Sequence, residues 1–174
     1  VVTSDLNYDH ARATVASLAA VRFGADGEAC VVTSAAAHVV ADLQAYLAAA
    51  AFDDVPNQRL VDTRAGTRPG DGARTELRGR PGATALVSVV ATDSVAPGFV
   101  QALACDAAAG ATSDVNYDRA GPVIVNTLTV VAFDADGSAC LYTSVGVHLV
   151  ADLQGYFADG TFQAVAARLV DTRR

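Results

Sequence analysis

An internal repeat constrains the fold of this chain more than any other feature of its sequence. Residues 4–9 reappear as residues 113–118, an offset of 113 − 4 = 109. Two further pairs of blocks return in the same order: residues 23–30 as 133–140, and residues 41–46 as 151–156. The Arg-Leu-Val-Asp-Thr-Arg block at 59–64 recurs at 168–173. A period near 109 is too long for a solenoid repeat and suits a small domain, so the order predicts a tandem array of domains.

The two copies are not equally complete. Residues 65–111 occur only once. We therefore predict two regions: 1–58 as the C-terminal half of a preceding repeat, and 59–174 as a complete repeat that ends in the start motif of the next. The chain would hold about one and a half copies. It opens at Val1 without an initiator Met or a charged and apolar leader, which indicates a mature or fragmentary polypeptide.

Strand signals dominate the complete copy. Residues 83–92, 123–133 and 146–157 are rich in Val, Leu and Thr and are bounded by Gly, Pro or Asp. The Ala-rich stretch 40–52 invites a helix, but its second copy carries Gly155 and an Asp-Gly pair, which disfavour one, so we predict a strand in both copies. Seven or eight short strands per unit predict an all-β fold, an antiparallel β-sandwich of Ig-like or jelly-roll-like type. A barrel remains an alternative.

Composition narrows the class of partner. The 174 residues carry a net charge of -7, which argues against nucleic acid, and every basic side chain besides His is Arg. The mean hydropathy is +0.30, yet no run reaches the ~18 apolar residues of a spanning helix, so we expect no membrane insertion. Lys and Met are both absent, a bias typical of a GC-rich genome such as that of an actinobacterium.

Taken together, the repeated blocks resemble the repeat modules of secreted actinobacterial proteins. Such modules run from an R-L-hydrophobic-D-T-R start, seen at 59–64, to a D-hydrophobic-x-G-Y-F end, seen at 152–157. They occur in tandem or appended to secreted hydrolases and cell-surface proteins. The resemblance implies secretion or cell-surface localisation and modularity, and it supplies no catalytic residue. This chain departs from it at Ala45, where Gly is expected before Tyr46.

Three cysteines bear on the question of where each repeat unit begins and ends. In a secreted module, Cys105 and Cys140 of the complete copy most simply form a disulfide, worth ~3–4 kcal/mol in the chain-entropy model. The repeat offset places the partner of Cys30 just before residue 1. Cys30 is then unpaired within the chain. Alternatively, Cys30 pairs with Cys105, and the repeat units begin and end at other residues.

The repeated Asp and Arg side chains of the start motif predict a structural latch. Alternation along a strand puts Asp62 and Arg64 on one face, as it does Asp171 and Arg173. The pair is either a solvated ion pair or a partly buried latch that fixes the position of the strand. Its presence in both copies favours the latch.

Metal and hydrolytic chemistry are weakly indicated. Asp134 and Asp136 open like a calcium loop, but the later acidic ligand is missing, so we favour a tight hairpin turn at Asp136-Gly137 and expect no metal and no cofactor. Ser144, His148 and Asp152 are each four apart. Four residues of strand span ~13 Å, too far for a Ser-His-Asp relay, so we predict structural roles and no enzyme.

The remaining candidate is a sugar site. Amide groups and aromatic faces suit carbohydrate, and both occur in the repeated block, at Asn7 and Tyr8 and again at Asn116 and Tyr117. We predict a non-enzymatic extracellular structural or adhesive module whose partners are neighbouring repeats or other copies of the chain. The alternative is a carbohydrate- or cell-wall-binding module attached to a secreted hydrolase, with polysaccharide as its partner.

Overall fold

The computed structural model describes residues 3–110, 112–165, 170 and 172. Eight strands lie between residues 52 and 157, and no α-helix occurs in these described ranges. The strands are β1 (Phe52–Asp62), β2 (Arg74–Arg78), β3 (Thr84–Ser94), β4 (Gly98–Leu103), β5 (Val115–Tyr117), β6 (Gly121–Ala132), β7 (Ser138–Thr143) and β8 (His148–Phe157). A short 3-10 turn, η1 (Thr63–Ala65), follows β1. The predicted number of strands is confirmed.

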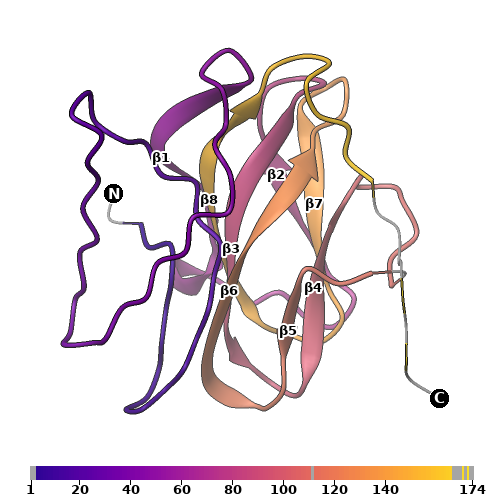
Figure 1. The fold of residues 1–174 in the computed structure, drawn as a ribbon. Helices are drawn as coiled ribbons and strands as arrows, with labels where there is room; N and C mark the ends of the chain where they lie inside the picture. The colour runs from indigo at the N-terminus through magenta and orange to yellow at the C-terminus, as the bar shows by residue number, and fades with distance from the viewer. Residues whose placement is uncertain (1–2, 111, 166–169, 171, 173–174) are drawn as a thin grey trace.

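The eight strands form two antiparallel sheets packed face to face (Figure 1). One sheet has the order β1-β8-β3-β6 and the other has the order β2-β7-β4-β5. The pairs β1 with β8, β2 with β7, β3 with β6 and β4 with β5 are those of one long hairpin wrapped into two layers. This arrangement is a jelly roll, so the all-β sandwich is confirmed in its jelly-roll form rather than its Ig-like form.

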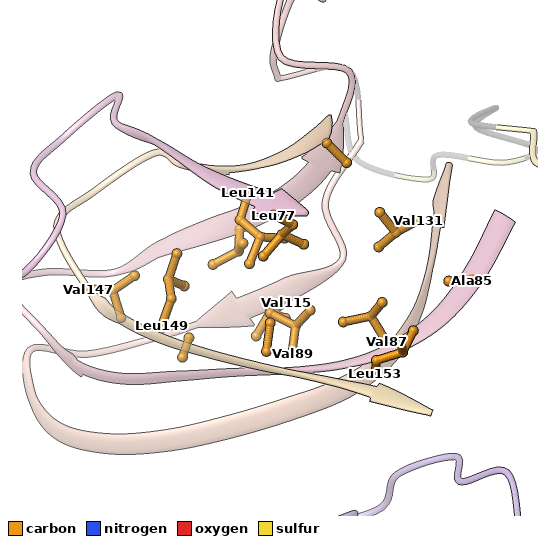
Figure 2. Close-up of a cluster of buried hydrophobic side chains, with 14 of the residues drawn as sticks. Leu77, Ala85, Val87, Val89, Val115, Val131, Leu141, Val147, Leu149 and Leu153 are labelled. Carbon is orange, nitrogen blue, oxygen red and sulfur yellow. The ribbon is translucent and has the colours of Figure 1, made fainter. Parts of the chain in front are cut away.

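The core lies between the sheets because alternate residues of the central strands point inward. In β3, Ala85, Val87 and Val89 are fully buried. The opposite sheet contributes Leu77 and Leu141, which Figure 2 places directly across the core from them. Each such aliphatic side chain contributes about 1.5–3 kcal/mol by leaving water. The fully buried residues of β3 lie at every second position, whereas β8 is buried from Leu149 to Tyr156 on both of its faces.

The turn predicted at the Asp-Gly pair is present, but it is not a hairpin. Gly137 has φ +79, and Gly137 N donates to Asp134 O at 2.8 Å. The strands on either side, β6 and β7, belong to different sheets, so the turn carries the chain across the sandwich. The hairpin interpretation was wrong because turn chemistry specifies the bend and not the pairing of the strands that follow.

The first copy folds differently from the second. Residues 3–51 contain no strand, although the sequence predicted one over 40–52, and only Phe52 at its end is extended within β1. In Figure 1 this segment is the indigo-to-purple meander that runs beside the sheet containing β1 and β8. A strand needs a neighbour for its N–H and C=O groups, and the strand prediction for 40–51 was wrong because no neighbour adjoins it.

A few polar contacts attach this segment to the edge strand β6, to the residues just before β6 and to β1. The Asn126 side chain accepts a hydrogen bond from Asn7 N at 3.0 Å and donates to Asp5 O at 2.7 Å. Asp9 accepts from Arg119 at 2.9 Å, and Arg22 pairs with Asp54. The predicted boundary between 58 and 59 falls inside β1, whose first residue is Phe52.

Candidate functional site

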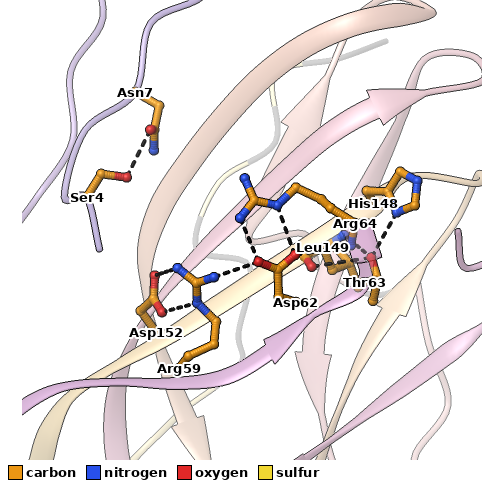
Figure 3. Close-up of polar contacts among 9 residues, drawn as sticks. All are labelled: Ser4, Asn7, Arg59, Asp62, Thr63, Arg64, His148, Leu149 and Asp152. Atoms are coloured by element: carbon orange, nitrogen blue, oxygen red, sulfur yellow. Dashed lines mark hydrogen bonds and ion pairs between the residues drawn. The ribbon is translucent and has the colours of Figure 1, made fainter. Parts of the chain in front are cut away.

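A cluster of polar side chains lies on the outer face of the first sheet, where β1 meets β8 (Figure 3). Arg59 and Asp152 are register partners across these strands, and Arg59 Nε donates to Asp152 Oδ1 at 2.5 Å. Asp152 is only 2% exposed and Arg59 is half-buried. Removing one partner of such a pair would leave the other charge without compensation. This contact therefore fixes β1 against β8 in a single register.

Arg59 also reaches the motif's own carboxylate. Its Nη1 donates to Asp62 Oδ2 at 2.6 Å, while Arg64 donates to Asp62 through Nε at 2.9 Å and Nη2 at 2.6 Å. The hydrogen bond from Arg64, followed by its charge and that of Arg59, lowers the pKa of Asp62 to about 2. The same contact raises the pKa of Arg64.

The structure describes one of the two predicted latch pairs, Asp62 with Arg64. Asp62 and Arg64 do pair, but Arg64 is half exposed and neither side chain reaches β8. The ties to β8 come from Arg59 and from Thr63, whose Oγ1 accepts a hydrogen bond from Leu149 N at 2.8 Å. Asp171 and Arg173 lie outside the residues that the structure describes.

Sequence reasoning missed Arg59 as the partner of Asp152. A signal was present, because the Arg that opens the start motif and the Asp that opens the end motif both occur twice in the chain, at Arg59 and Arg168 and at Asp42 and Asp152. Only the register of β1 on β8 brings the two motifs together.

The predicted disulfide is present. Cys105 and Cys140 are bonded, and Cys30 is free and exposed. Cys105 lies just after β4, and Cys140 lies in β7. The bond is therefore within the complete copy and closes the loop that contains β5 and β6.

The Asp136 carboxylate belongs to its turn. Its Oδ1 accepts hydrogen bonds from Ser138 N at 3.0 Å and Ser138 Oγ at 2.7 Å. These bonds, the side-chain one first, lower its pKa. Within the described ranges, no three His, Cys, Asp or Glu side chains gather as metal ligands would.

The residues considered for a sugar site are separated by the fold. Tyr117 is 3% exposed, and its hydroxyl donates to Val145 O at 2.6 Å, so its ring is part of the core. Asn116, next to it on β5, is exposed. Tyr8 donates to Ala35 O at 3.2 Å. Asn7 accepts a hydrogen bond from Ser4 at 2.9 Å, as Figure 3 shows. Tyr117 therefore presents no aromatic face on which a sugar ring could stack.

Asn7 lines a cavity of about 350 Å³ on the same outer face. Its other polar walls include Ser4, Arg64 and Asp93, with Val90 and Ile124 beneath. Residues 4–7 form one wall, so the shape of the cavity depends on the segment that lacks strands. Its lining is about equally polar and apolar, and the Asp152 carboxylate in it is held by Arg59.

The serine, histidine and aspartate of the repeated end region each hold a different part of the fold. Ser144 Oγ accepts from Phe99 N at 2.8 Å, and His148 Nδ1 lies 3.1 Å from Thr63 Oγ1. Asp152 is bound to Arg59. These separate partners agree with the strand argument that spacings of four do not bring the three side chains together.

Comparison of the chain with models of protein families, with curated proteins and with solved structures finds no match. No helix in the described part of the chain has the length and apolarity needed to cross a membrane. The function must therefore be argued from the fold and from the repeat.

Proposed function

We propose that the chain is part of a non-enzymatic, extracellular structural or adhesive protein built from tandem jelly-roll repeats. One observation carries the proposal: polar side chains that both copies share are used, in the complete copy, to hold strands and loops. Eight shared positions make such contacts: Asp114, Tyr117, Asp136, Thr143, Ser144, His148, Asp152 and Tyr156. Because both copies keep the side chains that hold the fold together, what the repeat preserves is its structure.

The disulfide supports the extracellular part of the proposal. Structural disulfides persist in oxidising compartments and are rare in the cytosol. The bond between Cys105 and Cys140 is compatible with such a compartment. The resemblance to secreted actinobacterial repeat modules agrees with this inference.

Identification of the intact parent protein by mass spectrometry, in medium and cell-surface fractions of the producing organism, tests the proposal. We expect a parent made of several repeats and recovered outside the cytosol. A cytosolic parent with reduced cysteines would contradict it.

A second candidate function, carbohydrate binding, is favoured by the position of Asn7 in the wall of this cavity. Pull-down of the chain with a panel of insoluble polysaccharides separates the two. Saturable binding to one glycan that Asn7→Ala abolishes, and that Asn116→Ala leaves intact, would favour the binding module over the structural one. Asn116 is a matched control because it is the repeat equivalent of Asn7 and is exposed on β5.

A further inference from the structure

Residues 3–51 expose more apolar surface than a folded segment normally does. Val32 is 90% exposed, Val40 86% and Tyr46 79%. Leu43, Val31 and Phe23 are exposed as well. Single apolar residues on a surface are ordinary, but a contiguous run of them marks a surface that another polypeptide covers.

The repeat shows what covers these side chains in a complete unit. Most equivalents of the exposed residues are buried in the second copy, where Leu141, Leu149 and Leu153 are fully buried and Phe133 and Tyr156 are nearly so; Tyr142, the equivalent of Val32, is partly exposed. They correspond in order to Val31, Val39, Leu43, Phe23 and Tyr46. The same residue types thus fill the core of one jelly roll and lie on the surface of the other segment.

Local contacts of the complete copy are already formed in residues 3–51. The turn at Gly24 has the bonds of the turn at Asp134: Gly24 N donates to Glu28 O at 2.8 Å, as Asp134 N donates to Ser138 O at 2.8 Å. Gly27 has φ +81 where Gly137 has φ +79.

A long-range contact also recurs. Tyr8 donates to Ala35 O at 3.2 Å, and its equivalent Tyr117 donates to Val145 O at 2.6 Å. Ala35 is the repeat equivalent of Val145. The start of the segment therefore contacts the same position in the first copy as in the complete one. The segment therefore keeps one turn and one tyrosine contact of the β5–β8 half, but none of its strands.

The missing partners are the strands β1 to β4. In the complete copy, β3 lies between β8 and β6, and β4 lies between β7 and β5, so every strand of the second half depends on the first half. The chain contains two second halves, 3–51 and 112–160, but one first half, 52–103. A second copy of this chain brings the same excess, so it cannot complete both halves.

We propose that residues 3–51 are an open half of a jelly roll that a further copy of the β1–β4 segment, from a repeat unit outside these 174 residues, completes by strand pairing. The completing segment carries an Arg to pair with Asp42, as Arg59 pairs with Asp152, and a cysteine at the place of Cys105 to bond with Cys30. Apolar strand edges recruit such partners through main-chain hydrogen bonds and alternate side chains.

The disulfide step has a defined balance. The Cys30 thiol and the thiol of the completing segment each lose a proton and an electron as the S–S bond forms. A low-molecular-weight disulfide such as oxidised glutathione takes up both electrons and both protons and becomes two thiols. Cys30 is exposed and therefore open to this exchange.

One position distinguishes the completing strand from β1. A Cβ atom at Gly155 would lie 2.6 Å from Asp53 O and 2.5 Å from the ring of Phe52. The first copy has Ala45 at this place. A strand that pairs with residues 3–51 must therefore lie farther from Ala45 than β1 lies from Gly155, and it must carry a side chain smaller than Phe at the position of Phe52. Substitution Ala45→Gly removes this mismatch.

The inference rests on the proposed function only in treating the repeat as a building block. Its test reads strand pairing and disulfide formation in purified protein, so failure of the test leaves the extracellular location untouched. Conversely, a cytosolic parent would contradict the proposed function without affecting the pairing.

The experiment extends the full chain with a copy of residues 52–109 placed directly before Val1, in the wild-type background and with Ala45→Gly. Both proteins are refolded with reduced and oxidised glutathione. Non-reducing peptide mapping should recover Cys30 bonded to the added cysteine. Trypsin cleavage after Arg12 and Arg22 should slow at least about tenfold, because cleavage then requires opening of a packed unit.

The matched control is the same extension with Leu77→Asp and Val87→Asp in the added copy only, which destroys its core face. The proposal is overturned if Cys30 stays reduced in both extensions and trypsin cuts them at the rate of this control. The bond between Cys105 and Cys140 reports whether the original unit still folds.

If the extension disturbs that bond, the chain is instead refolded with a separate polypeptide of residues 52–109. A mixed disulfide that includes Cys30 supports the proposal. Exclusive recovery of Cys105 bonded to Cys140, with Cys30 reduced, overturns it.

Discussion

The two copies of the repeat show how much of a β-fold is local. Residues 3–51 and 112–160 share their blocks, their Asp-Gly turn and their tyrosine tie to a backbone carbonyl. Only the second copy forms strands, and only its apolar residues are buried. The turn and the tyrosine contact form within the segment, whereas strands need partners from 52–103. Strand formation in this repeat is therefore a property of the whole unit.

The largest effect should come from placing a carboxylate at equivalent apolar positions. Leu153 is fully buried, so Leu153→Asp should cost about 4 kcal/mol or more of the free energy of unfolding. Leu43 is 61% exposed, so Leu43→Asp should cost less than about 0.5 kcal/mol. Urea denaturation of both variants makes the comparison. Equal losses would show that the first copy is packed in solution.

Removal of the disulfide should have the next largest effect. The bond joins residues 35 apart, so Cys140→Ser should lower the free energy of unfolding by about 3–4 kcal/mol in the chain-entropy model. Its repeat equivalent, Cys30→Ser, should leave stability unchanged, because Cys30 is free. Thermal unfolding under non-reducing conditions measures both. A destabilised Cys30→Ser chain would contradict the assigned pairing.

The glycine of the end motif gives an intermediate effect. A Cβ at Gly155 would meet the backbone oxygen of Asp53, so Gly155→Ala should push β1 away from β8 and cost about 1–3 kcal/mol. Ala45→Gly in the isolated chain should change stability by less than about 0.5 kcal/mol, since no strand opposes it. Hydrogen exchange of β1 amides provides the readout, and unchanged exchange in Gly155→Ala would be inconsistent with the close approach.

Protonation of Asp62 by acid should produce the smallest effect. The pKa of Asp62 is about 2 in the folded chain and 3.8 when unperturbed. The contribution of Asp62 is thus fully present above pH 4 and is lost as the pH falls toward 2. Because Arg64 is half exposed, we expect a loss of about 1 kcal/mol. Denaturation at pH 5 and pH 2.5 should show a smaller difference in Arg64→Gln than in the wild type.

The sequence predicted features that depend on composition and local spacing. The Val- and Thr-rich run at 83–92 identified β3, the Asp-Gly pair identified a turn, and the cysteine count identified the disulfide. Pairing across the chain could not be read in this way. Arg59 meets Asp152 only because β1 is the neighbour of β8, at a separation of 93 residues.

Burial of polar and aromatic side chains was likewise beyond local reasoning. Tyr117 has the aromatic ring that a sugar site needs, yet this ring is part of the core because Val115 and Tyr117 occupy the inward-facing positions of β5. The strand expected at 40–51 failed for the opposite reason. Its second copy forms β8, but the strands that would pair with it are absent from its surroundings.

The pairing of Phe52 with Phe157 has a mechanical consequence. The first residue of β1 faces the last residue of β8, so both ends of the unit leave from the same end of one ladder. Tension applied through neighbouring units would load the β1–β8 hydrogen bonds one after another, as in a zipper, rather than all at once. The bond between Cys105 and Cys140 then withholds the intervening loop from extension. Single-molecule stretching should show low-force opening, with a longer released length after reduction; equal lengths with and without reductant would contradict this consequence.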